Sequence, residues 1–244
     1  HRDLHSFPTR RSSDLAAITV TSLSEADQGE VLPIRQTCGP LAYATDFAIK
    51  AEEYPLSRRV FAYTGDAVQS STGNDFVEYL TSADAQPLIA QAGYVDQVVV
   101  SEPISLQGTR MTSAILSATT GATLGLVQNF SRDLATADRL STTFRFTSGS
   151  ARLDNKSIED VQRMVDFLNS PEARNREVLI IGFTDDVGRF DLNERLALLR
   201  ATSVREALVS AVGGDVLAGR MSVSSYGPLA PVGCNETADG RESN

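Results

Sequence analysis

Hydrophobic and polar positions alternate most regularly after residue 140. Phe144 and Phe146 are separated by polar residues, a period of two that predicts a half-buried strand over residues 141–149. Beyond Asp154 or Asn155, either of which can cap a helix, apolar residues recur every three or four positions. That spacing predicts an amphipathic helix whose apolar face carries Ile158, Val161, Val165 and Leu168.

A second strand, a long helix and a third strand are expected next. Residues 176–185 are almost continuously apolar, as in a central strand covered on both faces. A helix is predicted over 191–212, ended by Gly213 and Gly214, with an apolar stripe of Ala197, Ala201, Val204 and Leu208. Residues 220–227 resemble a strand, and the tail from Pro228 is turn-like. This order predicts a β-α-β-α-β unit, an α+β sandwich of helices against a sheet.

The pattern before residue 140 is weaker. Short apolar segments predict strands at 16–20, 31–34, 57–65 and 96–101. Helices are expected near 74–81 and over 82–93, the second capped by Ser82 and ended by Gly93. Residues 106–140 are rich in Ser, Thr and Ala, which favours one or two short helices connecting two domains; a flexible linker is the alternative.

Composition narrows the function classes. The 244 residues carry a net charge of -9, which argues against a nucleic-acid-binding surface. No segment approaches the roughly 18 apolar residues of a membrane helix. The only histidines are His1 and His5, and the two cysteines, Cys38 and Cys234, form no metal-binding motif. Their state stays open between one long-range disulfide, pairing outside this chain and two free thiols.

The opening residues have the composition of neither a strand nor a helix. Residues 5–15, HSFPTRRSSDL, match one translated frame of a common short-read sequencing adapter. A mitochondrial transit peptide should be amphipathic, and a basic phosphate-binding arm fits poorly with an acidic protein. We therefore expect that residues 1–15 are not native and that the biological sequence starts within a domain at Ala16.

Candidate chemistry concentrates in residues 182–201. Asp185 comes where the second strand should end, Gly188 permits a tight loop, and Asn193 and Arg200 lie two helical turns apart on one face. If the helix packs back along the strand, Asp185 and Arg200 flank one small pocket. A carboxylate beside a guanidinium suits a ligand that is both ammonium and carboxylate. An internal Asp185–Arg200 salt bridge is the alternative interpretation.

A known family resembles this part of the chain. Thr184, Asp185, Gly188, Asn193, Leu196, Arg200, Ala201 and Val204 match the motif TDxxGxxxxNxxLxxxRAxxV of the OmpA-like peptidoglycan-binding domain, and the resemblance spans residues 141–244. It implies that Asp185 and Arg200 hold the diaminopimelate residue of peptidoglycan, with Thr184, Asn193 and Leu196 in the same site. Phe183 replaces a histidine common in the family, which indicates a packing substitution. The family's final strand has no counterpart before Asn244, so we expect a truncated domain lacking its last strand.

Residues 16–105 resemble the C-terminal part of a phosphate-type (type 2) periplasmic solute-binding protein. EEYPLSRRVFAYT is similar to the strand that returns to the first lobe, and FVEYLTSADAQPLIAQAGYV to the helices after it. The resemblance implies a partial α/β lobe whose phosphate-binding residues are unknown, because the family's ligand segments would precede Ala16. The expected organisation is therefore residues 1–15 non-native, 16–105 solute-binding, 106–140 a helical linker and 141–244 OmpA-like.

Taken together, these features predict a non-catalytic periplasmic protein of a Gram-negative bacterium. It would bind peptidoglycan without cofactor or metal at the cell wall or outer membrane. Phosphate or another small anion would be a partner of the full-length protein. Two alternatives remain. One is a structural module with an internal salt bridge and no ligand. The other is a hydrolase that uses Asp185 and Asp186 as paired carboxylates. Adjacent residues at a strand end point to opposite sides, which is poor geometry for a shared substrate.

Overall fold

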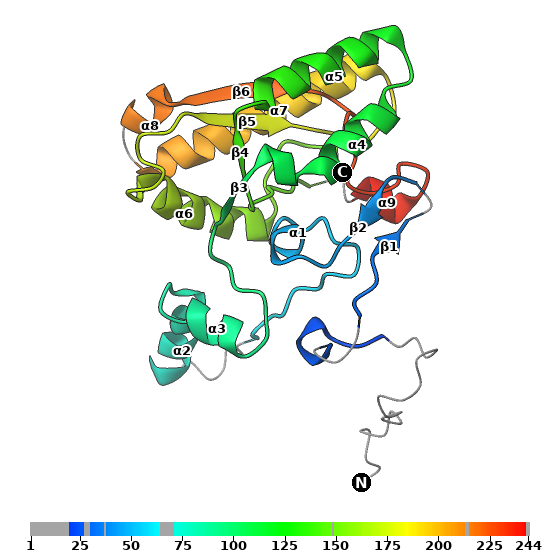
Figure 1. The fold of residues 1–244 in the computed structure, drawn as a ribbon. Helices are drawn as coiled ribbons and strands as arrows, with labels where there is room; N and C mark the ends of the chain where they lie inside the picture. The colour runs from blue at the N-terminus through cyan, green and yellow to red at the C-terminus, as the bar shows by residue number, and fades with distance from the viewer. Residues whose placement is uncertain are drawn as a thin grey trace.

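The computed structural model describes residues 20–26, 30–36, 38–63, 71–147, 149–212 and 215–242. Two short 3-10 helices lie at Leu23–Glu25 and Ile104–Leu106. The remaining elements, labelled in Figure 1, are β1 (Ile34–Arg35), β2 (Leu41–Ala42), α1 (Asp46–Lys50), α2 (Ser71–Thr81), α3 (Gln86–Gln91), β3 (Ser101–Pro103), α4 (Gly108–Ser117), α5 (Gly121–Leu134), β4 (Asp138–Leu140), α6 (Asn155–Asn169), β5 (Val178–Gly182), α7 (Phe190–Val212), α8 (Asp215–Gly219), β6 (Met221–Ser225) and α9 (Ala238–Glu242). The expectations for residues 1–15, for most of the strand at 16–20 and for Gly213 and Gly214 fall outside these residues.

The centre of the molecule is the parallel pair β5–β6, in register from Val178 opposite Met221 to Gly182 opposite Ser225. Helix α7 packs along both strands and α6 packs against α7. The Asp154 side chain caps α6, as the sequence predicted. The expected stripe of α7 is buried, and with α6 and α8 it forms a core whose largest fully buried side chains include Leu168, Leu208 and Leu217.

Helices α4 and α5 cover the opposite face of β5 and β6. Ile180 packs into the core under α6 and α7, whereas Ile181 packs with Phe130, Tyr226 and Leu229 into a second cluster. The strand is therefore covered on both faces, as its nearly continuous apolar sequence indicated. Of the one or two helices expected between residues 106 and 140, two are present, α4 and α5, and they pack on the sheet rather than merely joining two parts of the chain.

Gly182 allows α7 to lie close to β5. A Cβ atom at this position would stand 1.8 Å from the carbonyl oxygen of Ala197. Only a residue without a side chain permits this approach of helix to strand. The end of β5, where Asp185 follows, is thereby held against the middle of α7.

The strand predicted over 141–149 does not form. Within the described residues, this segment makes a single antiparallel bridge, between Phe146 and Leu153. A crevice separates residues 142–147 from residues 178–185, and both segments line it. Residues 142–147 therefore show the alternation of a strand, but in the described structure no strand edge lies beside them for pairing.

The first region, residues 20–105, contains little regular sheet. Strands β1 and β2, of two residues each, pair antiparallel as a hairpin, and β3 pairs antiparallel with β4. Four predictions need correction. The strand expected at 31–34 is reduced to β1, which begins only at Ile34. Residues 57–63 form no strand, and Val60, Phe61 and Tyr63 are 74%, 62% and 90% exposed. The strand at 96–101 begins only at Ser101. The helix at 82–93 is shortened to α3, which follows Ala85 and carries Pro87 in its first turn.

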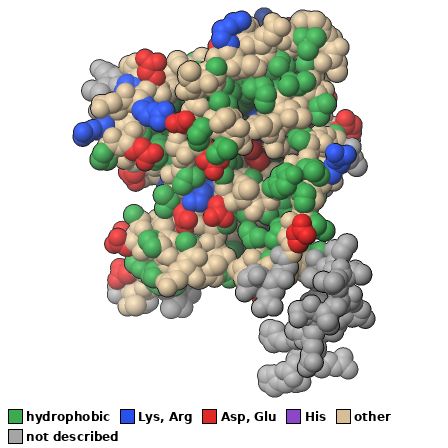
Figure 2. Space-filling model, in the orientation of Figure 1, with side chains coloured by type: hydrophobic (Ala, Val, Ile, Leu, Met, Phe, Trp, Pro, Cys, Tyr) green, Lys and Arg blue, Asp and Glu red, His purple; other side chains and the backbone are tan. Residues whose placement is uncertain are grey.

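Helices α2 and α3 form a lobe set away from the body (Figure 1). Figure 2 shows hydrophobic side chains on its surface, and Phe76, Leu88 and Tyr94 are each more than half exposed. Polar contacts at its base connect it to the body: Lys50 forms an ion pair of 2.7 Å with Asp96. In the part of the chain that the structure describes, no helix is both long and apolar enough to cross a membrane.

A disulfide joins Cys38, in the turn between β1 and β2, to Cys234, in the segment before α9. The two Cα atoms lie 5.6 Å apart although the residues are 196 positions apart in sequence. Of the alternatives that the sequence left open, the structure therefore has the long-range disulfide. It links the first region covalently to the end of the chain.

Candidate functional site

Asp185 lies in a loop that the protein holds in one shape. Gly188 has a φ of 97°, a left-handed conformation that glycine adopts without strain. The buried side chain of Asn193 donates hydrogen bonds to the carbonyl oxygens of Asp185 (3.2 Å) and Val187 (3.1 Å). The Oδ1 atom of Asp185 accepts one from the amide of Val187 at 3.0 Å. One carboxylate oxygen is therefore used to fix the loop.

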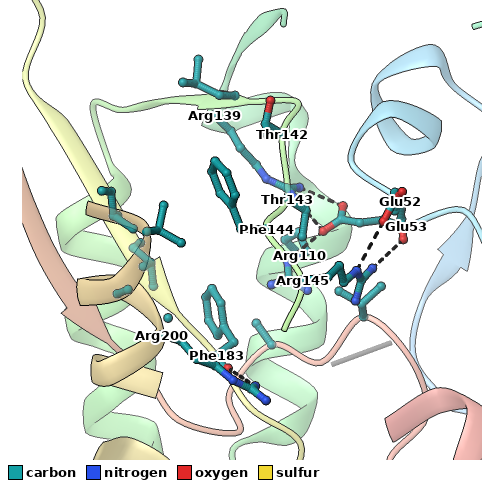
Figure 3. Close-up of a pocket in the computed structure, with 18 of the residues that line it drawn as sticks. Glu52, Glu53, Arg110, Arg139, Thr142, Thr143, Phe144, Arg145, Phe183 and Arg200 are labelled. Atoms are coloured by element: carbon teal, nitrogen blue, oxygen red, sulfur yellow. Dashed lines mark hydrogen bonds and ion pairs between the residues drawn. The ribbon is translucent and has the colours of Figure 1, made fainter. Parts of the chain in front are cut away.

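Arg200 projects from α7 toward the same loop. Its Nη1 donates to the carbonyl oxygen of Phe183 at 3.0 Å, and its Nε donates to that of Ser150 at 3.2 Å (Figure 3). The guanidinium lies 5.2 Å from the ring centre of Phe146, within cation–π range. Burial lowers the pKa of Arg200, and the Asp185 carboxylate partly opposes that shift. The guanidinium is held by the two carbonyl oxygens and by the ring of Phe146.

Asp185 and Arg200 line one crevice but make no direct ion pair with each other. Within the described residues, Oδ2 of Asp185 and Nη2 of Arg200 have no hydrogen-bond partner. A carboxylate oxygen and a guanidinium nitrogen are thus available at one place. The arrangement can receive a group with a positive and a negative end.

The other predicted site residues have different positions. Thr184 lines the crevice, but it is only 2% exposed and its hydroxyl is buried without a hydrogen-bond partner. Its amide donates to the carbonyl oxygen of Gly227. Asn193 lies behind the loop, and Leu196 is half-buried on α7 away from the crevice lining. These three residues support the loop and helix, whereas Asp185 and Arg200 present polar atoms to the crevice.

Arg200 is also held by two residues that the sequence did not predict for this site. Phe146 and Ser150 belong to the hairpin preceding α6, about fifty positions earlier in the chain. The alternation around Phe146 suggested burial but not a role beside an arginine. Phe183, expected to be a packing substitution, packs edge-on against Phe130 at 6.0 Å.

Potential metal ligands gather at one place in the described part of the chain: Cys38, Cys234 and Glu236. Both sulfur atoms are engaged in the disulfide, which leaves Glu236 as the single available donor of the group. The group is therefore unsuited to hold a metal ion in this oxidised form.

Comparison with known families identifies the second part of the chain. The model of the OmpA family matches residues 145–244. Residues 145–244 are an OmpA-like domain. The match confirms the resemblance noted for this part of the sequence and does not extend to residues 16–105.

Curated relatives agree with this assignment. Outer membrane porin F of Pseudomonas aeruginosa is 31% identical over 106 residues, which is 43% of this chain and 29% of the relative. Probable lipoprotein YiaD of Escherichia coli is 42% identical over 67 residues, 28% of this chain and 29% of the relative. The chain thus corresponds to under a third of the length of these relatives. Their names describe outer-membrane and lipoproteins of Gram-negative bacteria rather than enzymes, which agrees with the predicted location.

Among solved structures, the peptidoglycan-associated lipoprotein of Burkholderia pseudomallei is similar, with 28% identity and a TM-score of 0.36. The alignment covers 41% of this chain and 81% of that one. The C-terminal domain of MotB from Helicobacter pylori aligns with 25% identity and a TM-score of 0.36, over 41% of this chain and 76% of the other.

Proposed function

We propose that the OmpA-like domain anchors the protein non-covalently to peptidoglycan in the Gram-negative periplasm. Asp185 and Arg200 would hold the diaminopimelate residue of a stem peptide, with Asn193, Thr184 and Leu196 fixing the positions of these two. The ammonium group of the ligand would meet the free oxygen of Asp185. Its carboxylate would receive hydrogen bonds from the free side of the Arg200 guanidinium.

The observation that carries this proposal is the absence of an ion pair between Asp185 and Arg200, both of them described residues of one crevice. An internal salt bridge would satisfy both charges and would leave nothing for a ligand. Instead, each side chain is held by backbone groups and keeps polar atoms free. This geometry favours ligand binding over the structural module considered as the alternative.

We also propose that residues 16–105 belong to a solute-binding domain of the phosphate type. The support is the sequence resemblance of the segment around Glu52–Arg59 and of the residues that form α2 and α3. Phosphate binding by that domain is tested with the protein encoded by the complete gene. Failure of this test leaves the peptidoglycan proposal unaffected.

Co-sedimentation with purified peptidoglycan tests the anchoring function. The parent protein should pellet with a diaminopimelate-type wall and much less with a lysine-type wall, which lacks the second carboxylate of the side chain. Asp185→Ala and Arg200→Ala should each reduce binding about tenfold or more, as expected for charge-assisted hydrogen bonds.

Matched controls are available beside the site. Asp186 and Arg195 have the same charges as Asp185 and Arg200 but are exposed, and their alanine variants should pellet like the parent. Equal pelleting of all five proteins, or no preference between the two walls, would overturn the proposal. Circular dichroism of each variant establishes that the loss is not unfolding.

A further inference from the structure

A second group of charged side chains lies where the first region meets the sheet. Glu53, just after α1, receives two hydrogen bonds from the Arg139 guanidinium, at 2.6 and 2.8 Å, and lies 3.4 Å from Nε of Arg110 (Figure 3). Its neighbour Glu52 is bound by Arg59 at 2.7 Å and by Arg145 at 3.5 Å. These residues line the crevice at a distance in sequence from Asp185 and on different elements.

Arg110 is the unusual member of the group. Its side chain on α4 is 13% exposed, and Nη1 is buried without a hydrogen-bond partner. The guanidinium lies 5.1 Å from the ring centre of Phe183. A buried charged N–H group that lacks an acceptor is unfavourable, so a site of this kind attracts an acceptor.

The local charge balance is positive around Arg110. Burial lowers its pKa to about 10, Glu53 opposes the shift, and Arg139 and Arg145 add to it. Glu53 is shared between the two arginines, since it pairs with both, and Arg139 also donates to Oε1 of Gln107 at 2.7 Å. The one carboxylate of Glu53 therefore faces two guanidinium groups in a partly desolvated place.

Neutral hydrogen-bond donors stand beside these charges. Thr142 and Thr143 line the same cavity, and Figure 3 shows them on the segment next to the Arg139 side chain. Within the described residues their hydroxyl groups have no hydrogen-bond partner. The remaining wall includes the aromatic rings of Phe144 and Phe183.

We propose that Arg110 and Arg139, with one hydroxyl group of the adjacent pair Thr142 and Thr143, form a binding site for a small oxyanion such as inorganic phosphate. Guanidinium groups bind tetrahedral oxyanions and carboxylates with paired hydrogen bonds, and hydroxyl groups complete such a shell. Glu53 acts as the internal counter-ion of the site. The proposal is independent of peptidoglycan binding, because it uses other residues and another ligand.

Isothermal titration of the purified, oxidised chain with inorganic phosphate tests the site. Potassium chloride at matched ionic strength, sulfate and acetate are the comparison arms. Phosphate should bind with a saturable signal and raise the midpoint of thermal unfolding as its concentration increases. Sulfate should act similarly, acetate more weakly and chloride not at all.

Two variants identify the residues. Arg110→Gln should weaken phosphate binding tenfold or more, whereas Arg132→Gln, an exposed arginine on α5, should leave it unchanged. Glu53→Gln removes the internal carboxylate, so phosphate should restore a large part of the thermal stability that this variant loses. A purely structural Arg–Glu cluster predicts no such rescue.

The outcomes separate clearly. Saturable phosphate binding that Arg110→Gln weakens supports the site, as does rescue of Glu53→Gln. A signal that chloride reproduces, or that Arg110→Gln leaves unchanged, means an adventitious ion only and overturns the proposal. If the parent protein does not respond to phosphate, the proposal is overturned whatever the variants do. The test therefore decides even if a variant folds poorly.

Discussion

The two parts of this chain are held together by different forces. In residues 145–242, apolar side chains from α6, α7, α8 and the β5–β6 sheet fill a continuous core. The first region buries few large side chains, and Phe61, Tyr63 and Phe76 are mostly exposed. Its segment 38–59 is attached to the domain by the Cys38–Cys234 disulfide and by ion pairs of Glu52 with Arg145 and Lys156. Glu53 pairs instead with Arg139 and Arg110, which precede the domain in sequence.

The contrast shows which interactions a sequence pattern can specify. An apolar core requires periodic hydrophobic positions, and these are visible in the helices that build it. Attachment by charges requires only a few partners at fixed points in space. The first region is accordingly expected to respond to pH and reduction, and the OmpA-like domain to substitutions in its core.

The largest effect should come from opening a cavity in that core. Leu208 is 1% exposed on α7, and Leu208→Ala should lower the free energy of unfolding by about 3–5 kcal/mol. Urea denaturation followed by circular dichroism measures it. Phe61→Ala, at a position 62% exposed, is the matched large-to-small change and should stay within about 0.5 kcal/mol. Equal effects of the two substitutions would contradict the contrast between the regions.

A slightly smaller loss is expected where α7 meets β5. Gly182→Ala places a methyl group against the Ala197 carbonyl, and the helix must move away, at about 3 kcal/mol. Gly125→Ala provides the control, because a Cβ there meets nothing within 4 Å and the residue lies within α5. That change should stabilise the protein by about 0.5–1 kcal/mol. Thermal unfolding of both variants measures these changes. A Gly182→Ala variant as stable as the parent would show that the contact between α7 and β5 is not tight.

Removing the disulfide should affect the first region selectively. Cys38→Ser releases a cross-link that spans 196 positions, with a loss of about 2–3 kcal/mol. Hydrogen exchange should rise in residues 38–59 while α6 and α7 keep their protection. Reduction of the parent should reproduce the pattern, and reduction of the variant should add nothing. Uniform loss of protection across both regions would refute selective attachment.

The smallest effect concerns pH. Burial would raise the pKa of Glu53, but the charges of Arg110 and Arg139 and the hydrogen bond from Arg139 lower it below its ordinary value of 4.5. The folded state thus binds this proton more weakly than the unfolded chain. The stabilisation is complete above pH 4.5 and is lost as the pH falls below it.

Glu53→Gln tests that dependence. The variant should be less stable by about 1.5–2 kcal/mol at neutral pH, as for a hydrogen-bonded charge. Its stability should also change less than that of the parent between pH 6 and pH 3, as followed by thermal unfolding. A parent and a variant with parallel pH profiles would exclude Glu53 as the group responsible.

The sequence predicted the elements of the domain best where periodicity and burial coincide. The stripe of α7 around Ala201 and Leu208 is buried, and β5 is covered on both faces. The sequence predicts strands over residues 57–65, from their β-branched and aromatic residues, and over 141–149, from the alternation of Phe144 and Phe146 with polar residues. A strand also needs a partner edge, and that depends on the rest of the fold. Neither segment has one along its length in the described structure.

The candidate site was predictable in part. The sequence predicts that Asp185 and Arg200 flank one pocket if the helix packs back along the strand, and the two residues do line one crevice. The contacts of Arg200 with Phe146 and Ser150 depend on a hairpin from a distant part of the sequence. The contacts of Glu53 with Arg110 and Arg139 likewise join segments that are far apart in sequence. Such contacts between distant segments leave no periodic signal.

The two hydrogen bonds from Asn193 to the carbonyls of Asp185 and Val187 also bear on the speed and strength of recognition. A loop already fixed in its bound shape loses little conformational entropy when a ligand arrives. For the proposed binding of peptidoglycan, association would then be limited by encounter rather than by rearrangement, and detachment would require only the breaking of contacts with the ligand. Such an anchor would release and rebind a polymer strand repeatedly without refolding.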